Sequence, residues 1–153
     1  MQTIDQYLAD HPFFAGLTPE TLETIAGCAT NVRVRENERL LREGEPADTF
    51  YAIRRGRVAI ELRGATGRAV VLDSAHEGEI VGWSWLIPPN RWKFDARATT
   101  DVSAVAFDGA CLRGKCEADP VLGYELLGRV AQVMDRRLQS ARVRLLDMYG
   151  GAG

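Results

Sequence analysis

The spacing of apolar residues changes twice along this chain, from helical to alternating and back to helical. Between residues 32 and 107 the period is two, and Val58, Ile60 and Leu62 alternate with other residues, Glu61 among them. A period of two places successive side chains on opposite faces of half-buried strands. Several short strands separated by glycine-bearing turns predict an antiparallel sandwich or barrel, such as a jelly roll.

The clearest strand pair in this region is a hairpin. Residues 58–62 and residues 69–72 are both apolar, and the loop between them contains Gly64 and Gly67. A short glycine-bearing loop between two such runs is typical of a β-hairpin. Residues 102–107 provide a further apolar strand.

Helix signals precede the strands. Thr3 and Gln6 have the spacing of a capping box, and Thr18 precedes Pro19, which suits the first position of a helix. We therefore expect two short helices within residues 1–30.

A long helix is expected over residues 119–149, because Asp119 and Pro120 form a cap followed by a first-turn proline. Its apolar residues are separated by alternating steps of four and three, which is the seam of a coiled coil. The seam residues are Leu127, Ala131, Met134, Leu138, Ala141, Leu145 and Met148. Such a seam needs a partner helix, and we expect a homodimer; the alternative is that the helix lies on the β domain. The glycine-rich residues 150–153 are expected to end the helix.

Composition limits the class of protein. A chain of 153 residues predicts one domain, 1–153, and no apolar run approaches the roughly 20 residues of a membrane span. The formal charge of −2 gives no overall positive field for nucleic acid. The N-terminal residues lack the basic and apolar regions of a secretory signal, so a reducing cytoplasm is expected. The chain has three cysteines, an odd number, so we do not expect a disulfide framework. We expect the cysteines to be buried, neutral thiols.

Catalysis is not expected. The two histidines, His11 and His76, are scattered, whereas a metal-dependent barrel enzyme clusters histidines with a carboxylate. Cys111 and Cys116 lie too far apart for a typical zinc pair, although nearby cations would make Cys116 redox-sensitive if they lowered its pKa. No nucleophile elbow, phosphate loop or dinucleotide fingerprint occurs. The arginines around Arg136 suit the solvated flanks of a coiled coil.

One stretch resembles a known family. Residues 43–58, EGEPADTFYAIRRGRV, closely resemble the signature of cyclic nucleotide-binding domains, the sensory module of catabolite-activator-type regulators. Residues 11–20 resemble the entry helices of that family, and residues 78–82 the approach to its phosphate-binding cassette. The resemblance covers residues 4 to about 148.

The resemblance implies a fold and a role. It implies an eight-stranded antiparallel jelly roll, with the β-roll over residues 31–110, the cassette over 78–98 and a last helix that forms a dimer. Relatives that regulate transcription carry a helix-turn-helix domain after this helix. The chain ends there, so we expect a stand-alone, non-catalytic sensory module. The alternatives are a regulator without its DNA-binding domain, and a docking subunit with an inactive pocket.

The cassette departs from the pattern of the family. The family follows the last cassette glycine with a glutamate for the ribose hydroxyl, but Gly82 is followed by Trp83. The family then places an arginine against the cyclic phosphate. Counting back from the next strand without gaps puts that position at Trp92, whereas a shifted gap lets Arg91 fill it, and Arg97, farther along the strand, is another candidate. Weak binding of cyclic AMP and cyclic GMP is therefore expected.

Two hypotheses for the cassette stay open. In the first, a short helix starting near Gly82, two arginines and the tryptophans bind a small, planar, anionic ligand. Its residues are Gly82, Trp83, Ser84, Trp85, Arg91, Trp92 and Arg97. In the second, the tryptophans fill a degenerated pocket, and the arginines are solvated or pair with Asp95 and Asp101. Neither hypothesis includes a metal or cofactor.

Overall fold

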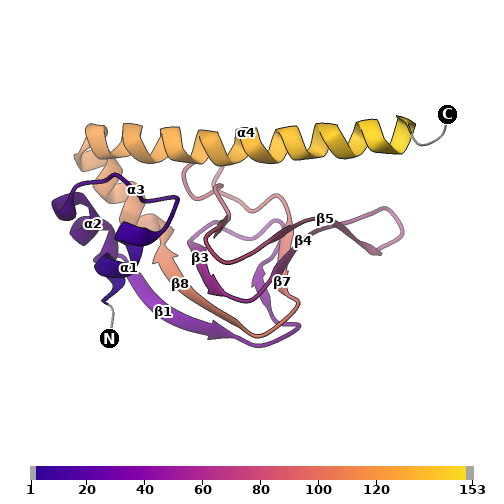
Figure 1. Ribbon diagram of the computed structural model, residues 1–153, viewed down its shortest axis with the longest axis horizontal. Helices are drawn as coiled ribbons and strands as arrows, with labels where there is room; N and C mark the ends of the chain where they lie inside the picture. Colours follow the sequence, from indigo (N-terminus) through magenta and orange to yellow (C-terminus); the bar gives the residue numbers. More distant parts are fainter. Residues whose placement is uncertain (1–2, 151–153) are drawn as a thin grey trace. The chain divides into compact units, whose positions relative to one another are not determined.

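The structure, a computed structural model, describes residues 3–150 and is mainly antiparallel β with flanking helices, as expected (Figure 1). The helices are α1 (Ile4–Asp10), α2 (Pro19–Ala26), α3 (Gly109–Ala118) and α4 (Pro120–Gly150). The strands are β1 (Ala29–Val34), β2 (Arg39–Leu41), β3 (Thr49–Arg55), β4 (Val58–Arg63), β5 (Ala69–Ala75), β6 (Ile80–Val81), β7 (Asp95–Ala98) and β8 (Val102–Asp108).

The chain divides into two compact units within α3, one up to Lys115 and one from Cys116 onward. The first unit holds all the strands of the described residues, and the second holds the long helix. From the length of the chain, we expected the strands and the long helix to belong to one domain.

Two four-stranded sheets make up the first unit. Their strand orders are β1-β8-β3-β6 and β2-β7-β4-β5, and every pair is antiparallel. The expected hairpin is β4 and β5, whose loop is closed by a hydrogen bond from the backbone N–H of Gly67 to Gly64 O at 2.9 Å. Phe14, Phe50 and Phe107 are fully buried, and their rings form a continuous series in the core.

The helix starts follow the local signals. The Thr3 side chain accepts a hydrogen bond from Gln6 N, and the Gln6 side chain accepts one from Thr3 N, which completes the capping box. Thr18 caps α2 in front of Pro19. Both predictions are confirmed because each depends only on residues adjacent in sequence.

Strand β4 corrects one expectation. The alternating pattern predicted a half-buried strand, yet Ala59 and Glu61 are as buried as Val58 and Ile60. Glu61 is paired with Arg97 of the neighbouring strand β7, so its charge has a partner where it is buried.

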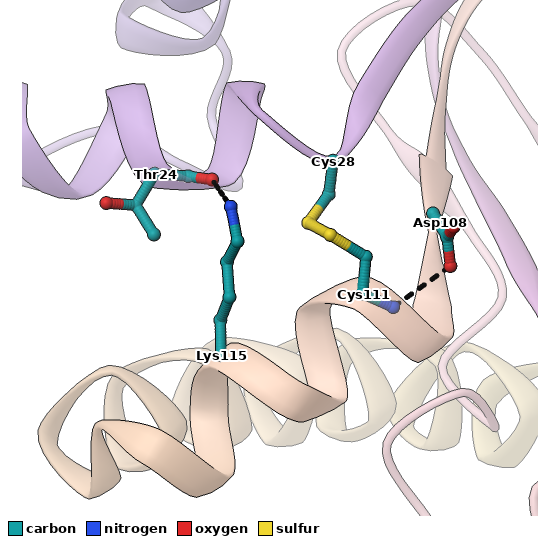
Figure 2. The surroundings of a disulfide bond; sticks show 5 residues. All are labelled: Thr24, Cys28, Asp108, Cys111 and Lys115. Carbon is teal, nitrogen blue, oxygen red and sulfur yellow. Dashed lines mark hydrogen bonds between the residues drawn. A yellow bond between two sulfur atoms is a disulfide. The ribbon is translucent and has the colours of Figure 1, made fainter.

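The cysteines correct another expectation. Cys28, just before β1, and Cys111, in α3, form a disulfide bond that joins positions 83 residues apart (Figure 2). Beside it, the Lys115 ammonium donates a hydrogen bond to Thr24 O at 2.8 Å (Figure 2). Only Cys116 remains as a free thiol, and burial raises its pKa, helped by Asp119 and Glu117, so the nearby cations do not lower it.

Helix α4 begins as predicted, with Asp119 Oδ1 accepting from the backbone N–H groups of Val121 and Leu122. Its buried residues are Leu122, Leu126, Val130 and Val133. They form a stripe beside the predicted seam, whose members are exposed in this single chain. The expected helix end lies beyond Gly150, outside the described residues. No helix among residues 3–150 is long and apolar enough to cross a membrane.

Candidate ligand-binding site

The segment 82–94 joins β6 to β7 and folds as successive turns. The first is closed by a hydrogen bond from Leu86 N to Trp83 O at 3.1 Å. The expectation of a short helix here is wrong, since no residue between β6 and β7 is helical. Pro88 and Pro89 follow closely and have no backbone N–H to continue helical turns. The segment therefore offers no helix N-terminus to an anion.

Trp92 packs directly on the backbone of Gly82. Gly82 has a φ of +97°, and a Cβ built on it would lie 2.6 Å from two ring carbons of Trp92 and 3.3 Å from Leu41. The indole is 4% exposed. If the ungapped count is taken, a buried aromatic ring stands where the family places a cation.

Trp85 and Ser84 belong to the core. The Trp85 ring is fully buried and stacks on Phe50, with centroids 4.6 Å apart and an interplanar angle of 7°. The Asn90 amide donates to Ser84 O at 3.0 Å and to Trp85 O at 3.1 Å, which fixes this turn. The geometry here favours the second hypothesis, in which these side chains fill the site.

Trp83 and Arg91, like Arg97, are members of the predicted set that are not fully buried. Trp83 is half-buried, with its ring edge-to-face against Phe94 at 6.1 Å. Arg91 is exposed, and its guanidinium donates to Gly44 O at 2.8 Å. Arg91 is thus held against the turn before β3 and remains open to solvent.

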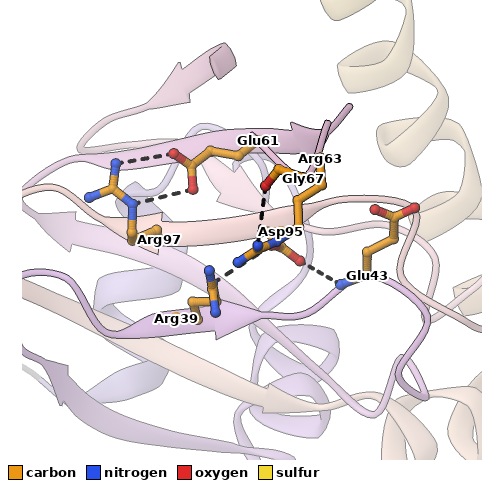
Figure 3. Close-up of polar contacts among 7 residues, drawn as sticks. All are labelled: Arg39, Glu43, Glu61, Arg63, Gly67, Asp95 and Arg97. Carbon is orange, nitrogen blue, oxygen red and sulfur yellow. Dashed lines mark hydrogen bonds and ion pairs between the residues drawn. The ribbon is translucent and has the colours of Figure 1, made fainter. Parts of the chain in front are cut away.

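Arg97 is paired within the second sheet. It forms two hydrogen bonds to the Glu61 carboxylate, at 3.2 and 3.1 Å, and one to Asn37 at 3.1 Å (Figure 3). The hydrogen bond to Glu61 raises the pKa of the Arg97 guanidinium above its ordinary value. Because side chains alternate along β7, Arg97 shares a face with Asp95 and is opposite Ala96. Its carboxylate partner is Glu61, which neither hypothesis named.

The same face of the sheet carries a second charged group that sequence reasoning missed. Asp95 is 8% exposed, and its carboxylate lies 3.7 Å from both Arg39 and Arg63 and accepts from Glu43 N at 2.8 Å (Figure 3). A buried carboxylate requires such partners. The alternation of side chains along each strand is visible in the sequence. It does not show that Asp95, Arg39 and Arg63 are neighbours, because that depends on the order of the strands in the sheet.

Arg113, in α3, was also missed. Its guanidinium donates to Trp85 O at 2.6 Å and to Ala47 O at 3.1 Å, and it lies 3.6 Å from Asp48. It therefore ties α3 to the cassette turn. No local pattern marks it, because the contact joins segments far apart in sequence. Among residues 3–150, no group of three or more His, Cys, Asp or Glu side chains is placed to hold a metal ion.

Comparison with characterised proteins gives related regulators. The chain is 28% identical over 145 residues to a CRP-like cAMP-activated global transcriptional regulator of Mycobacterium tuberculosis, covering 95% of this chain and 63% of the relative. It is 30% identical to the acetyltransferase Pat of Mycolicibacterium smegmatis, covering 90% of this chain and 38% of that enzyme. The chain thus spans less than two thirds of either relative.

Solved structures agree in fold. A protein from Geobacter metallireducens, described as cyclic nucleotide-binding, superposes with a TM-score of 0.80 at 30% identity, over 90% of this chain and 99% of that one. A cyclic nucleotide-binding domain from Methylobacillus flagellatus superposes with a TM-score of 0.81 at 18% identity, over 97% and 87% of the two chains, a likeness of fold alone. The family model for the cyclic nucleotide-binding domain matches residues 31–119, more than half of the sequence. The chain therefore belongs to the cyclic nucleotide-binding domain family.

Proposed function

We propose that this chain is a non-catalytic sensory module that does not bind cyclic AMP or cyclic GMP tightly. The observation that carries the proposal is the Trp92 ring, which is buried against Gly82. An ungapped count gives this position to the phosphate-binding arginine of the family. An indole offers one N–H donor and no charge, so it does not replace a guanidinium.

The other residues of the cassette do not replace the missing contacts to a cyclic nucleotide. Trp83 stands where the family has a carboxylate, and a ribose hydroxyl buried without a partner costs roughly 1–3 kcal/mol. Arg97 is engaged with Glu61 on the sheet face. Of the cations of the cassette, Arg91 and Lys93 are exposed to solvent.

The ligand expected in this module is a small anion. Arg91 supplies charge and Trp83, eight residues earlier in the same segment, supplies an aromatic face, a combination that suits a planar anionic molecule. Trp85 and Trp92 have structural roles in this proposal, as part of the core that supports the segment.

Calorimetric titration with cyclic AMP and cyclic GMP tests the proposal. We expect dissociation constants weaker than about 100 µM for both nucleotides. The variant Trp83→Glu/Trp92→Arg restores the two family residues and should gain affinity, whereas each single variant should gain less. Submicromolar binding by the wild type would overturn the proposal.

The module is proposed to act as a homodimer through α4. In the single chain, Leu127, Leu138 and Leu145 of the predicted seam are 49%, 49% and 53% exposed. A row of large apolar side chains at coiled-coil spacing is stabilised when a second helix covers it. A second copy of this helix presents the same spacing and can pair with it in register.

A further inference from the structure

A separate cavity lies in the first unit, away from the cassette. Its volume is about 560 Å³, and no residue from 82 to 97 lines it. The walls come from α1, from β1, β3 and β8, and from the loop after β5. The lining residues are Tyr7, Asn31, Val32, Arg33, Arg54, Arg55, Glu77, Ser103 and Ala104.

Two arginines flank a serine across three neighbouring strands of this cavity. Ser103 on β8 pairs with Arg33 on β1 and with Arg55 on β3. Neither arginine side chain forms a hydrogen bond or ion pair with any residue from 3 to 150. Adjacent strands are ~4.8 Å apart, so the two backbones are ~10 Å apart and both guanidinium groups can reach one ligand above the Ser103 hydroxyl.

The third arginine of the cavity is held in position. Arg54 donates to Asn31 Oδ1 at 3.0 Å, and its guanidinium carbon lies 4.6 Å above the centre of the Tyr7 ring. Tyr7 is fixed in turn, because its hydroxyl donates to Ile53 O at 3.2 Å. One cation is thus ordered in advance, which lowers the entropic cost of binding an anion.

The charge of the cavity suits a dianion. Three arginines face one carboxylate, Glu77, which leaves a formal charge of +2 among the lining residues. Arginine binds phosphate oxygens through paired N–H donors, and a hydroxyl between two guanidinium groups adds a further donor.

We infer that this cavity is a binding site for a small phosphorylated molecule, whose phosphate lies over Ser103 between Arg33 and Arg55. The volume falls in the range of about 300–1,000 Å³ typical of small-molecule sites. Tyr7 and Glu77 bound the cavity beside the strands, which favours a compact ligand over an extended acidic chain. The site is independent of the cassette and of what the cassette binds.

The test uses nuclear magnetic resonance titration of the full chain with pyrophosphate and ribose 5-phosphate, and with sulfate for comparison. Amide shifts should localise to Arg33, Ser103 and Arg55, with dissociation constants for the phosphorylated probes below about 1 mM. Tryptophan emission should not change, because no tryptophan lines the cavity.

Matched variants separate a specific site from general charge. Arg33→Gln/Arg55→Gln should weaken binding roughly tenfold or more. The control Arg35→Gln/Arg57→Gln removes equal charge from exposed residues outside the cavity lining and should change affinity less than about twofold. Ser103→Ala, a smaller change, should weaken binding without altering the net charge.

Three results would overturn the inference. The first is equal loss in both double variants, which indicates non-specific attraction. The second is no localised shift with any probe. The third is tighter binding of a polyglutamate peptide than of both phosphorylated probes, which would indicate an acidic protein partner.

Discussion

At the scale of single residues, Gly82 shows how one missing side chain shapes the site. Its positive φ is a conformation that other residues rarely adopt, and Trp92 occupies the space of a Cβ. Replacement by alanine therefore adds a backbone cost of about 1–2 kcal/mol and a packing cost of about 1–3 kcal/mol. We predict that Gly82→Ala lowers the free energy of unfolding by about 3 kcal/mol, measured by urea denaturation.

A matched glycine separates these two costs. Gly44 has a φ of +86°, and nothing lies within 4 Å of a Cβ built on it, so Gly44→Ala should cost only about 1 kcal/mol. In a Trp92→Leu background, Gly82→Ala should cost no more than Gly44→Ala does. If the cost stays near 3 kcal/mol there, the contact with Trp92 is not its source.

His11 gives the fold a dependence on pH. Burial lowers the pKa of His11 to about 4 from its ordinary value of 6.5, and the nearby Glu79 backbone offsets this lowering in part. The unfolded chain therefore binds this proton more tightly, and stability is full above pH 6.5 and falls as the pH drops toward 4. We predict a loss of about 2 kcal/mol from this residue between pH 7 and pH 5.

The other histidine is the natural control. In His11→Asn the new side-chain oxygen can still accept from Phe13 N, as His11 Nδ1 does, but the titrating group is gone. The slope of unfolding free energy between pH 7 and pH 5 should flatten in this variant. His76 is exposed, and His76→Asn should leave the slope unchanged. An unchanged slope in His11→Asn would assign the dependence to other groups.

At the scale of elements, the disulfide ties α3 to the start of β1. It closes a loop of 83 residues, and bonds of this kind contribute roughly 2–5 kcal/mol by restricting the unfolded chain. We predict that Cys28→Ser/Cys111→Ser loses that amount in urea denaturation, and that the reduced wild type matches it. Cys116→Ser should keep the dependence on reductant. Three titratable thiols in the unreduced, denatured wild type would contradict the pairing.

Local signals explain which elements the sequence predicts. The starts of α1, α2 and α4 depend on caps beside them in the chain, and all three were predicted correctly. Helix α3 was not predicted, since Gly109 and Gly114 weaken its helical pattern. The strands β2 and β6 are too short for an alternation of apolar and polar residues to be recognised in the sequence. The disulfide needed the tertiary fold, because 83 residues separate its partners.

In the candidate site, too, features that depend on neighbouring residues could be predicted from the sequence, and contacts between distant segments could not. The departure at Trp83 and the position of Trp92 come from counting along one segment, and both are visible in sequence. The partners of Arg97 and Arg113 are not, because Glu61 and Trp85 reach them through strand pairing and helix packing. Period-two alternation gave two possible faces for Arg97, and only the sheet order shows that its face also carries Asp95.

At the scale of the whole molecule, the two proposed ligand sites and the proposed dimer rest on different parts of the chain. The cassette and the arginine-lined cavity share the first unit, and the apolar seam belongs to the second. Helix α3 crosses the boundary, and its Arg113 contacts the carbonyl of Trp85. The cassette turn is therefore linked directly to α3, the segment that precedes α4 in the chain.

The dimer itself is the last prediction. Leu138→Glu/Leu145→Glu would place two pairs of like charges in the seam, where burial of a charge is strongly unfavourable, so this variant should sediment as a monomer and the wild type as a dimer at micromolar concentration. Arg136→Glu changes the net charge by the same −2 at an exposed position outside the seam and should remain dimeric. A monomeric wild type would exclude pairing through α4, and a double variant that stays dimeric would place the interface elsewhere, because these two leucines occupy equivalent positions of successive heptads in the exposed row.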